Sequence, residues 1–292
     1  MTRVGFVGLG AMGLPMAGHL VEKGFDVAAF DLRADAVEAA AEAGARRAGT
    51  AAEAARGAAA LVLMVVNARQ AAAVLFEGGA LDALEQDGIV VLMATCAPAE
   101  VEALDERIAA AGRRLVDAPV SGGVVGARAG TLTIMAAAPA DTFAAARPML
   151  DAMGDKVFHV GERPGQGAMV KTVNQLLCGV HIAAAAEAFS LAAKAGLDGA
   201  LLLKILGGSA ASSWMLNNRG PRMLQDDPEV ASAVDIFVKD LGIVLDAGRG
   251  SRSALPLAAA AHQMFLAASG LGHGAEDDSQ VLAAYRALNG GS

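Results

Sequence analysis

Basic side chains are scarce in this sequence and form no run. The 23 Lys and Arg residues stand against 31 Asp and Glu residues, which gives a formal net charge of −8 over 292 residues. A surface that binds nucleic acid or an anionic membrane needs clustered positive charge. We therefore expect no nucleic-acid partner and no membrane partner, and the composition favours chemistry on a small molecule.

Cysteines and long apolar runs are also nearly absent. Cys96 and Cys178 lie far apart and match none of the metal or redox spacings, so we interpret both as small buried side chains and expect no metal site. No segment reaches the roughly 18 charge-free apolar residues of a membrane helix, and the nearest, 176–186, contains His181. The apolar N-terminal run is spaced by glycines and lacks the cleavage pattern of a secretory signal. These features predict a soluble, cytoplasmic protein.

Short β-branched segments alternate with alanine-rich segments up to about residue 160. Hydrophobic residues make up 54% of the chain and aromatic residues only 4%, which indicates a helix-rich protein with a core of small aliphatic side chains. The alternation predicts βαβ units and a mostly parallel, doubly wound sheet covered on both faces. The predicted strands are 4–8, 26–31, 60–66, 89–95, 113–120, 131–137 and 156–161.

Strand signals stop beyond Gly165, where helical segments follow one another. The change predicts two domains, an α/β domain over 1–163 and an all-α domain over 164–292. The first helix is long, although Gly179 weakens it locally by about 1 kcal/mol. The predicted helices are 166–195, 198–207, 209–226, 232–249 and 255–270.

A glycine-rich turn follows the first predicted strand and opens a helix. Its G-x-G-x-x-G spacing is typical of a turn that binds the pyrophosphate of a dinucleotide. The first glycine makes the tight turn, the second lets the backbone approach the pyrophosphate, and the third lets helix and strand pack closely. The N-terminus of the helix adds the positive end of its dipole. The predicted cofactor turn comprises Gly8, Leu9, Gly10, Ala11, Met12 and Gly13.

Asp31 ends the second predicted strand, about twenty residues after the turn, where a carboxylate accepts hydrogen bonds from ribose hydroxyls. Because a carboxylate there repels the 2′-phosphate of NADP, the sequence favours NAD. Arg33 can pair with that phosphate, so weaker use of NADP is expected too. The adjacent Leu32, and Val66 and Asn67 at the end of the third strand, complete this part of the predicted cofactor site.

An apolar helix carries Lys171 and, three residues later, Asn174, so the two share one face. A lysine on an apolar face usually extends its ammonium group to solvent. Alternatively, burial lowers the pKa of the ammonium from about 10.4 towards the range in which it can shuttle a proton. Oxidation of an alcohol by hydride transfer needs such a group, because the hydroxyl must lose its proton.

The segment DAPVSGGVVGARAGTLTIM, residues 117–135, places Ser121, Gly122 and Gly123 after a predicted strand. Ligands bind at the carboxyl end of the strands in such folds. Backbone N–H groups and the serine hydroxyl at this edge can hold a carboxylate. The alternative is a simple glycine turn between two strands.

Four segments together resemble the signature regions of the β-hydroxyacid dehydrogenases, the family of 3-hydroxyisobutyrate dehydrogenase and tartronate semialdehyde reductase. They are GLGAMGLPMAGHL, DAPVSGGVVGARAGTLTIM, GQGAMVKTVNQLL and VKDLGIVLD, and the resemblance covers essentially the whole chain. It implies a Rossmann domain, a helical domain joined through one long shared helix, and a homodimer or homotetramer built largely from the helical domains. His19 stands where the family commonly has asparagine, beyond the phosphate turn, and we expect little functional consequence.

The resemblance also implies roles for individual residues. It makes Lys171 the proton-transferring residue and Asn174 a substrate-positioning amide, with the substrate carboxylate bound at 121–123. Thr95 and Lys239 match family positions that contact the dinucleotide near its nicotinamide, and Lys239 also matches a substrate-facing position.

Further segments resemble the L-threonate dehydrogenase branch of this family. They are NQLLCGVHIAAAAEA, SAASSWMLNNR, SAVDIFVKDLGIVLD and HQMFLAASGLGHGAEDDSQV. The resemblance implies NAD-dependent oxidation of L-threonate to its 2-oxo acid, with 3-hydroxyisobutyrate dehydrogenase and tartronate semialdehyde reductase as alternatives. A polyhydroxylated substrate needs several polar partners, and for each candidate a surface or capping role is equally open. The candidates are His181, Ser212, Ser213, Trp214, Asn217, Asn218, His273, Asp277 and Asp278.

Two other classes of protein share this kind of fold. A non-catalytic scaffold has no need of a proton shuttle, and the imine reductases typically lack a lysine at the proton-transfer position. Lys171 and Asn174 therefore argue against both alternatives.

Overall fold

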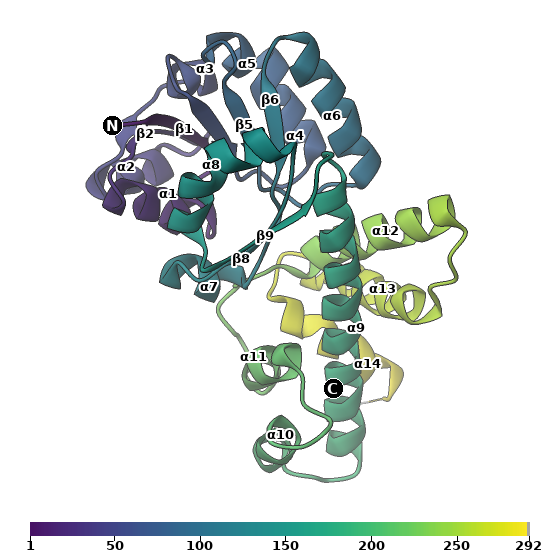
Figure 1. Cartoon of the computed structure of the whole chain (residues 1–292). Helices are drawn as coiled ribbons and strands as arrows, with labels where there is room; N and C mark the ends of the chain where they lie inside the picture. Colours follow the sequence, from purple (N-terminus) through teal and green to yellow (C-terminus); the bar gives the residue numbers. More distant parts are fainter. Residues whose placement is uncertain (291–292) are drawn as a thin grey trace. The chain divides into compact units, whose positions relative to one another are not determined.

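The computed structural model describes residues 1–290, which form two compact units (Figure 1). The first unit ends at Lys171 and the second begins at Thr172. This division falls inside the helix α9 (Gln166–Lys194), so one helix contributes to both units. The predicted boundary after residue 163 lies in the turn before α9 and stays a prediction. Residues 291 and 292, the end of the predicted second domain, lie outside the described residues.

The first unit is built on one sheet, whose order is β3-β2-β1-β4-β5-β6-β8-β7, with β9 paired to β8. All pairs are parallel except those of β8 with β6 and β7. The predicted mostly parallel sheet is therefore confirmed. The strands are β1 (Arg3–Val7), β2 (Asp26–Phe30), β3 (Arg46–Arg47), β4 (Ala60–Leu63), β5 (Ile89–Leu92), β6 (Arg114–Asp117), β7 (Val120–Ser121), β8 (Thr133–Ala137) and β9 (Lys156–Gly161).

Two apolar cores cover the two faces of this sheet, because successive side chains of a strand point to opposite sides. In β4, Val62 belongs to one core and Leu61 and Leu63 to the other. The first core includes buried residues of α1, α2 and α8, and the second includes those of α3 to α6. The helices of this unit are α1 (Gly13–Glu22), α2 (Ala34–Glu42), α3 (Ala51–Ala55), α4 (Ala68–Ala72), the π-helix η1 (Ala73–Glu77), α5 (Ala80–Ala83), α6 (Pro98–Ala110), α7 (Gly123–Ala129) and α8 (Ala140–Met153).

The carboxyl ends of five parallel strands form one row. The register pairs Val7 with Phe30 on one side and Leu63 on the other, and continues through Leu92 to Asp117. The segments that follow these strands therefore leave the sheet at the same edge. The strand order reverses between β1 and β4, which is where open α/β sheets bind ligands.

The second unit is helical, as predicted, and packs around its own apolar core. Phe237 and Phe265 stack in that core with ring centroids 5.1 Å apart. Gly179 of α9, predicted as a weak point, permits close packing instead, since a Cβ there would lie 2.8 Å from the side chain of Leu241. The remaining helices are α10 (Gly199–Gly207), α11 (Trp214–Met223), α12 (Val234–Ser251), α13 (Pro256–Ala268), the π-helix η2 (Ser269–His273), the 3₁₀ helix η3 (Asp278–Gln280) and α14 (Val281–Leu288).

Several predicted elements differ from those observed. The predicted strand 113–120 is two strands, since Pro119 has no N–H for the ladder. The predicted helix 209–226 is shorter, because Ser213 caps α11 by accepting a hydrogen bond from the N–H of Leu216 at 3.0 Å. The last helix, 281–288, was not predicted.

The helix α9 is also long and apolar enough to cross a membrane by length and composition. It holds no run of 18 charge-free apolar residues, because Lys171 and Glu187 interrupt it. Half of its most apolar window is buried inside the protein. A core helix of a soluble protein passes the same test, so this property is weak support for a membrane span.

Candidate functional site

The turn between β1 and α1 has the backbone that a pyrophosphate-binding loop requires. Gly8 has a φ of +98°, and a Cβ there would overlap the carbonyl oxygen of Met64. A Cβ at Gly13 would overlap the carbonyl oxygen of Gly8, so only glycine lets α1 start directly on the turn. Within the described chain, no atom beyond its neighbours lies within 4 Å of a Cβ built on Gly10, and no side chain caps α1. The other turn residues are Leu9, which is buried, Ala11, which is exposed, and Met12, which is half-buried.

Asp31 holds this turn from the end of β2. Its Oδ2 accepts a hydrogen bond from the N–H of Leu9 at 2.7 Å, and its Oδ1 accepts from the N–H of Arg33 at 2.9 Å. The guanidinium of Arg33 donates to Oδ1 at 3.2 Å and to the carbonyl of Leu9 at 3.0 Å. Burial favours a higher pKa for Asp31, but these donors outweigh it and hold the pKa below its ordinary value of 3.8. Asp31 is therefore an anion at neutral pH.

A hollow of about 690 Å³ adjoins the turn, between α1 and α2. Its lining includes Gly10 and Ala11 of the turn, together with Arg33. Open space beside Gly10, uncapped N–H groups at the start of α1 and an anionic carboxylate fit a dinucleotide with its pyrophosphate on the turn.

The other predicted cofactor residues follow β2, β4 and β5 at the same edge. Leu32 is 94% exposed and Val66 is 47% exposed, whereas Thr95 is half-buried. Asn67 caps α4, because its Oδ1 accepts a hydrogen bond from the N–H of Gln70 at 2.9 Å. The side chain of Asn67 therefore has a structural role as a helix cap, and its contact with the cofactor stays a prediction.

The predicted carboxylate-binding turn leads into a helix. Ser121 ends β7, and Gly122 and Gly123 have φ angles of +128° and +61°, which favour glycine. Gly123 is itself the first of the seven residues of α7, so the two glycines lead into a helix and do not join two strands directly, and carboxylate binding at this turn stays a prediction.

His19 connects α1 to the end of α7. Its Nε2 lies 3.1 Å from the carbonyl oxygens of Ala127 and Arg128, and its Nδ1 lies 3.1 Å from a carboxylate oxygen of Glu22. The residue that departs from the family pattern therefore has a packing role. That it has little functional consequence stays a prediction.

Lys171 is buried, with 8% of its surface exposed, although a lysine on an apolar helix ordinarily extends to solvent. Asn174 follows one turn later and donates from Nδ2 to the Sγ of Cys178 at 3.1 Å. Its Oδ1 is buried and has no hydrogen-bond partner among residues 1–290. A buried polar atom without a partner is destabilising, so this oxygen is suited to accept a hydrogen bond from a ligand. Both cysteines are buried thiols, as predicted.

Asp117, which the sequence indicated only as a strand end, fixes the start of α9. The residue is 1% exposed, and its Oδ2 accepts hydrogen bonds from the N–H groups of Gly165 at 2.9 Å and Ala168 at 2.8 Å. Burial raises the pKa of Asp117 to about 6, although the N–H groups of Ala168, Gly165 and Gly167 act to lower it. No sequence pattern predicts this contact, because the partners lie about fifty residues further along the chain.

Lys239 lies on α12 in the second unit. Its Nζ is 2.8 Å from the Oδ1 of Asp240, and the Oδ2 of Asp240 accepts a hydrogen bond from Gln175 at 2.6 Å. This network joins α9 and α12 within the second unit. The predicted place of Lys239 beside a nicotinamide and substrate stays a prediction.

The polar candidates of the helical unit mostly have structural partners. Asp278 is fully buried and accepts hydrogen bonds from Arg219, from Nε to Oδ1 at 3.0 Å and to Oδ2 at 3.3 Å, and from Nη2 to Oδ2 at 2.7 Å. Asp277 is also fully buried, 3.1 Å from the Nε of Arg222. These contacts give both aspartates a structural role, the alternative that the sequence left open. Of the others, Ser213 caps α11, Ser212 and Asn217 bond to each other, Asn218 accepts from Arg219, His273 pairs with Glu276, and His181 and Trp214 are exposed.

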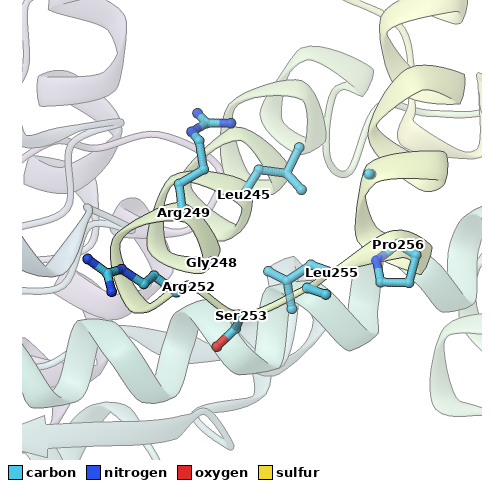
Figure 2. Close-up of a pocket in the computed structure, with 9 residues that line it drawn as sticks. Leu245, Gly248, Arg249, Arg252, Ser253, Leu255 and Pro256 are labelled. Carbon is cyan, nitrogen blue, oxygen red and sulfur yellow. The ribbon is translucent and has the colours of Figure 1, made fainter.

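A separate pocket of about 590 Å³ lies at the end of α12 (Figure 2). Arg249 and Arg252 extend on one side of it, and Leu245, Leu255 and Pro256 give it an apolar side. None of the residues predicted from the sequence for catalysis or cofactor binding lines this pocket.

Comparison with known proteins matches both units. Residues 3–161 match the NAD-binding domain of 6-phosphogluconate dehydrogenase. Residues 165–285 match the region described as NAD-binding of NADP-dependent 3-hydroxyisobutyrate dehydrogenase.

Individual relatives match over nearly their whole length. L-threonate dehydrogenase of Cupriavidus necator is 46% identical over 280 residues, covering 96% of this chain and 94% of the relative. The 3-hydroxyisobutyrate dehydrogenase of Pseudomonas aeruginosa is 36% identical over 296 residues, covering 98% and 99%. The crystal structure of 3-hydroxyisobutyrate dehydrogenase from Salmonella typhimurium has a TM-score of 0.93 and 40% identity, covering 97% of this chain and 99% of that one.

Proposed function

The chain belongs to the 3-hydroxyisobutyrate dehydrogenase family of NAD(P)-dependent hydroxyacid dehydrogenases, and from this premise we propose that it oxidises L-threonate to its 2-oxo acid. The observation that carries the proposal is the pair on α9: a buried lysine followed one turn later by an amide oxygen without a partner among residues 1–290. Such a pair can take a proton from one hydroxyl and accept a hydrogen bond from another.

The turn from Gly8 to Gly13 holds the cofactor in this proposal. The open space beside Gly10 and the uncapped N–H groups of α1 bind the pyrophosphate. Asp31, an anion, accepts hydrogen bonds from the ribose hydroxyls and repels a 2′-phosphate, so NAD is preferred over NADP. When bound, NAD accepts the hydride that leaves the hydroxyl-bearing carbon.

The proton leaves through Lys171. In this proposal the buried Lys171 accepts the hydroxyl proton on its Nζ as a neutral amine. Asn174 positions the substrate through its Oδ1 and one substrate hydroxyl. The N–H groups and hydroxyl of 121–123 would bind the substrate carboxylate, and the family resemblance assigns Lys239 to the nicotinamide end of the cofactor.

The choice of L-threonate is supported by the 46% identity to a dehydrogenase named for that acid. Relatives named 3-hydroxyisobutyrate dehydrogenase, at 36% and 40% identity, support that acid as the second candidate. Tartronate semialdehyde reduction is the third. Initial rates of NADH formation with the two acids, and of NADH consumption with the semialdehyde, separate the three. A clear preference for L-threonate is expected, and a preference for 3-hydroxyisobutyrate would contradict the assignment.

We also propose that the enzyme works in the cytoplasm as a homodimer or homotetramer, with no nucleic-acid or membrane partner. Large apolar side chains are exposed on α9 and α10 of the second unit: Leu177 (50%), Leu191 (69%), Leu201 (58%) and Ile205 (56%). Burial of such side chains against a second copy removes them from water.

A further inference from the structure

One buried carboxylate, that of Asp117, links the sheet to the first turn of α9 through hydrogen bonds. Asp117 ends β6, in the row of strand ends, and is 1% exposed. Its Oδ2 accepts hydrogen bonds from Gly165 and Ala168 at 2.9 and 2.8 Å, and the N–H of Gly167 also donates to the carboxylate. A buried carboxylate with several N–H donors at a helix N-terminus is both satisfied and favourably placed in the helix dipole.

Close packing holds the same turn in one place. A Cβ at Gly167 would lie 2.5 Å from the carbonyl oxygen of Met135 and 2.7 Å from that of Asp117. Gly165, before the helix, has a φ of +95°, which favours glycine. The start of α9 therefore packs directly against the backbone at the end of β6 and in the middle of β8, without an intervening side chain.

Lys171 stands three residues after Ala168 on the same rigid helix, so any shift of the first turn also displaces Lys171. We propose that Asp117 is a positioning residue for the reaction, which holds α9 so that the amine of Lys171 stays in place to take the hydroxyl proton. Asp117 acts through backbone N–H groups and does not touch the substrate. The proposal rests on the role proposed above for Lys171.

The same short segment carries the turn that binds the substrate carboxylate in the proposed function, because Ser121 follows Asp117 after three residues. Asp117 thus sets the position of the proton acceptor relative to the bound acid. A misplacement of about 1 Å in such a geometry lowers the rate on the order of a hundredfold.

The test compares two replacements of Asp117 in the full-length protein with the acid that the wild type oxidises fastest. Asp117→Ala removes the acceptors, and we expect kcat to fall on the order of a hundredfold while the KM for NAD stays the same. Asp117→Asn keeps an oxygen for the same N–H groups, and we expect it to recover much of kcat. The control is Thr50→Ala, which removes the side chain that caps α3 through the N–H of Glu53 at 3.1 Å, and we expect its kcat to be unchanged.

A second variant keeps the proposal testable if Asp117→Ala does not fold. Gly167→Ala pushes the same turn away from the sheet by sterics alone, and we expect the same loss of kcat with an unchanged KM for NAD. Amide hydrogen exchange should show faster exchange at Gly167 to Lys171 in both variants and unchanged exchange in α12.

The outcomes separate the two proposals. If Asp117→Ala and Gly167→Ala keep the wild-type kcat per folded molecule while Lys171→Ala is inactive, the positioning role is overturned and the role of Lys171 stands. If Lys171→Ala keeps the wild-type kcat, the proposed role of Lys171 as proton acceptor is contradicted.

Discussion

At the scale of single residues, two aspartates at the carboxyl ends of strands β2 and β6 of one sheet have pKa values shifted in opposite directions. Asp31 is part-exposed and receives two backbone N–H bonds and a guanidinium, so its pKa lies below the ordinary value. Asp117 receives backbone N–H bonds alone, and burial raises its pKa to about 6. The spacing of Asp31 to the glycine turn predicted its role in the cofactor site. The role of Asp117 could not be predicted, because its hydrogen-bond partners lie about fifty residues further along the chain.

Replacement of Asp31 by serine should shift the enzyme from NAD towards NADP. Serine removes the charge that repels a 2′-phosphate, while Arg33 remains to pair with it. Loss of one charged hydrogen-bonding group corresponds to about 1.5–3 kcal/mol, so the ratio of kcat/KM for NAD to that for NADP should fall about tenfold or more.

The ratio, measured from initial rates, is the readout, because Asp31 also supports the turn and both cofactors lose that support equally. Glu38→Gln, at an exposed position that pairs with Arg47, is the control and should leave the ratio unchanged. An unchanged ratio in Asp31→Ser would show that the carboxylate does not select the cofactor.

At the scale of elements, periodicity predicted the long helices and buried strands and missed contacts between distant segments. The helix 166–195 was predicted almost to its observed ends, because no proline or pair of glycines interrupts it. The short elements β3, α7 and α14 carry too few residues for a pattern to emerge. The hydrogen bonds between Asp117 and the start of α9 join segments about fifty residues apart, so no local sequence pattern predicts them.

The buried carboxyl of Asp117 should make the free energy of unfolding depend on pH. The folded chain holds the Asp117 proton up to about pH 6, whereas an unfolded aspartate releases it near its ordinary pKa of 3.8. The folded state therefore binds more protons between these values, so the stabilising contribution is complete below about pH 4 and is lost as pH rises through 6. A shift of about two pKa units corresponds to about 3 kcal/mol.

Urea unfolding of the wild type and Asp117→Asn, at about pH 4 and about pH 7, isolates this contribution. Asp278, whose burial also raises its pKa, is common to both proteins and cancels in the comparison. The wild type should lose about 3 kcal/mol more of its free energy of unfolding than the variant between the two pH values. Equal losses would mean that Asp117 does not titrate in this window.

At the scale of the whole molecule, the division into an α/β part and a helical part could be predicted from the sequence. The buried ion pairs inside the helical unit could not. Asp277 and Asp278 stood in a segment that looked suited to a polyhydroxylated substrate, yet both pair with arginines of α11. A buried carboxylate needs such a partner, and sequence alone does not show which arginine supplies it. The substrate is equally hard to predict, since relatives named for different acids match the chain over nearly its whole length.

The exposed apolar side chains of α10 predict an oligomer that a pair of charges should disrupt. Sedimentation of the wild type should give a mass of two or four chains of 29.2 kDa. The double variant Leu201→Glu, Ile205→Glu should sediment nearer to one chain, because carboxylates buried without a partner strongly oppose association. Leu257→Glu, on α13 of the same unit and 68% exposed, is the control. A wild type that sediments as a single chain would contradict the proposal.

The role of Lys171 as proton acceptor is tested by NADH formation from L-threonate, measured for the wild type and for Lys171→Ala. Lys194, near the exposed end of the same helix, supplies the matched control Lys194→Ala. We expect kcat to fall by about two to four orders of magnitude in Lys171→Ala, with NAD binding unchanged and the control fully active. Wild-type turnover by Lys171→Ala would contradict this role, because the hydroxyl proton would then leave by another route.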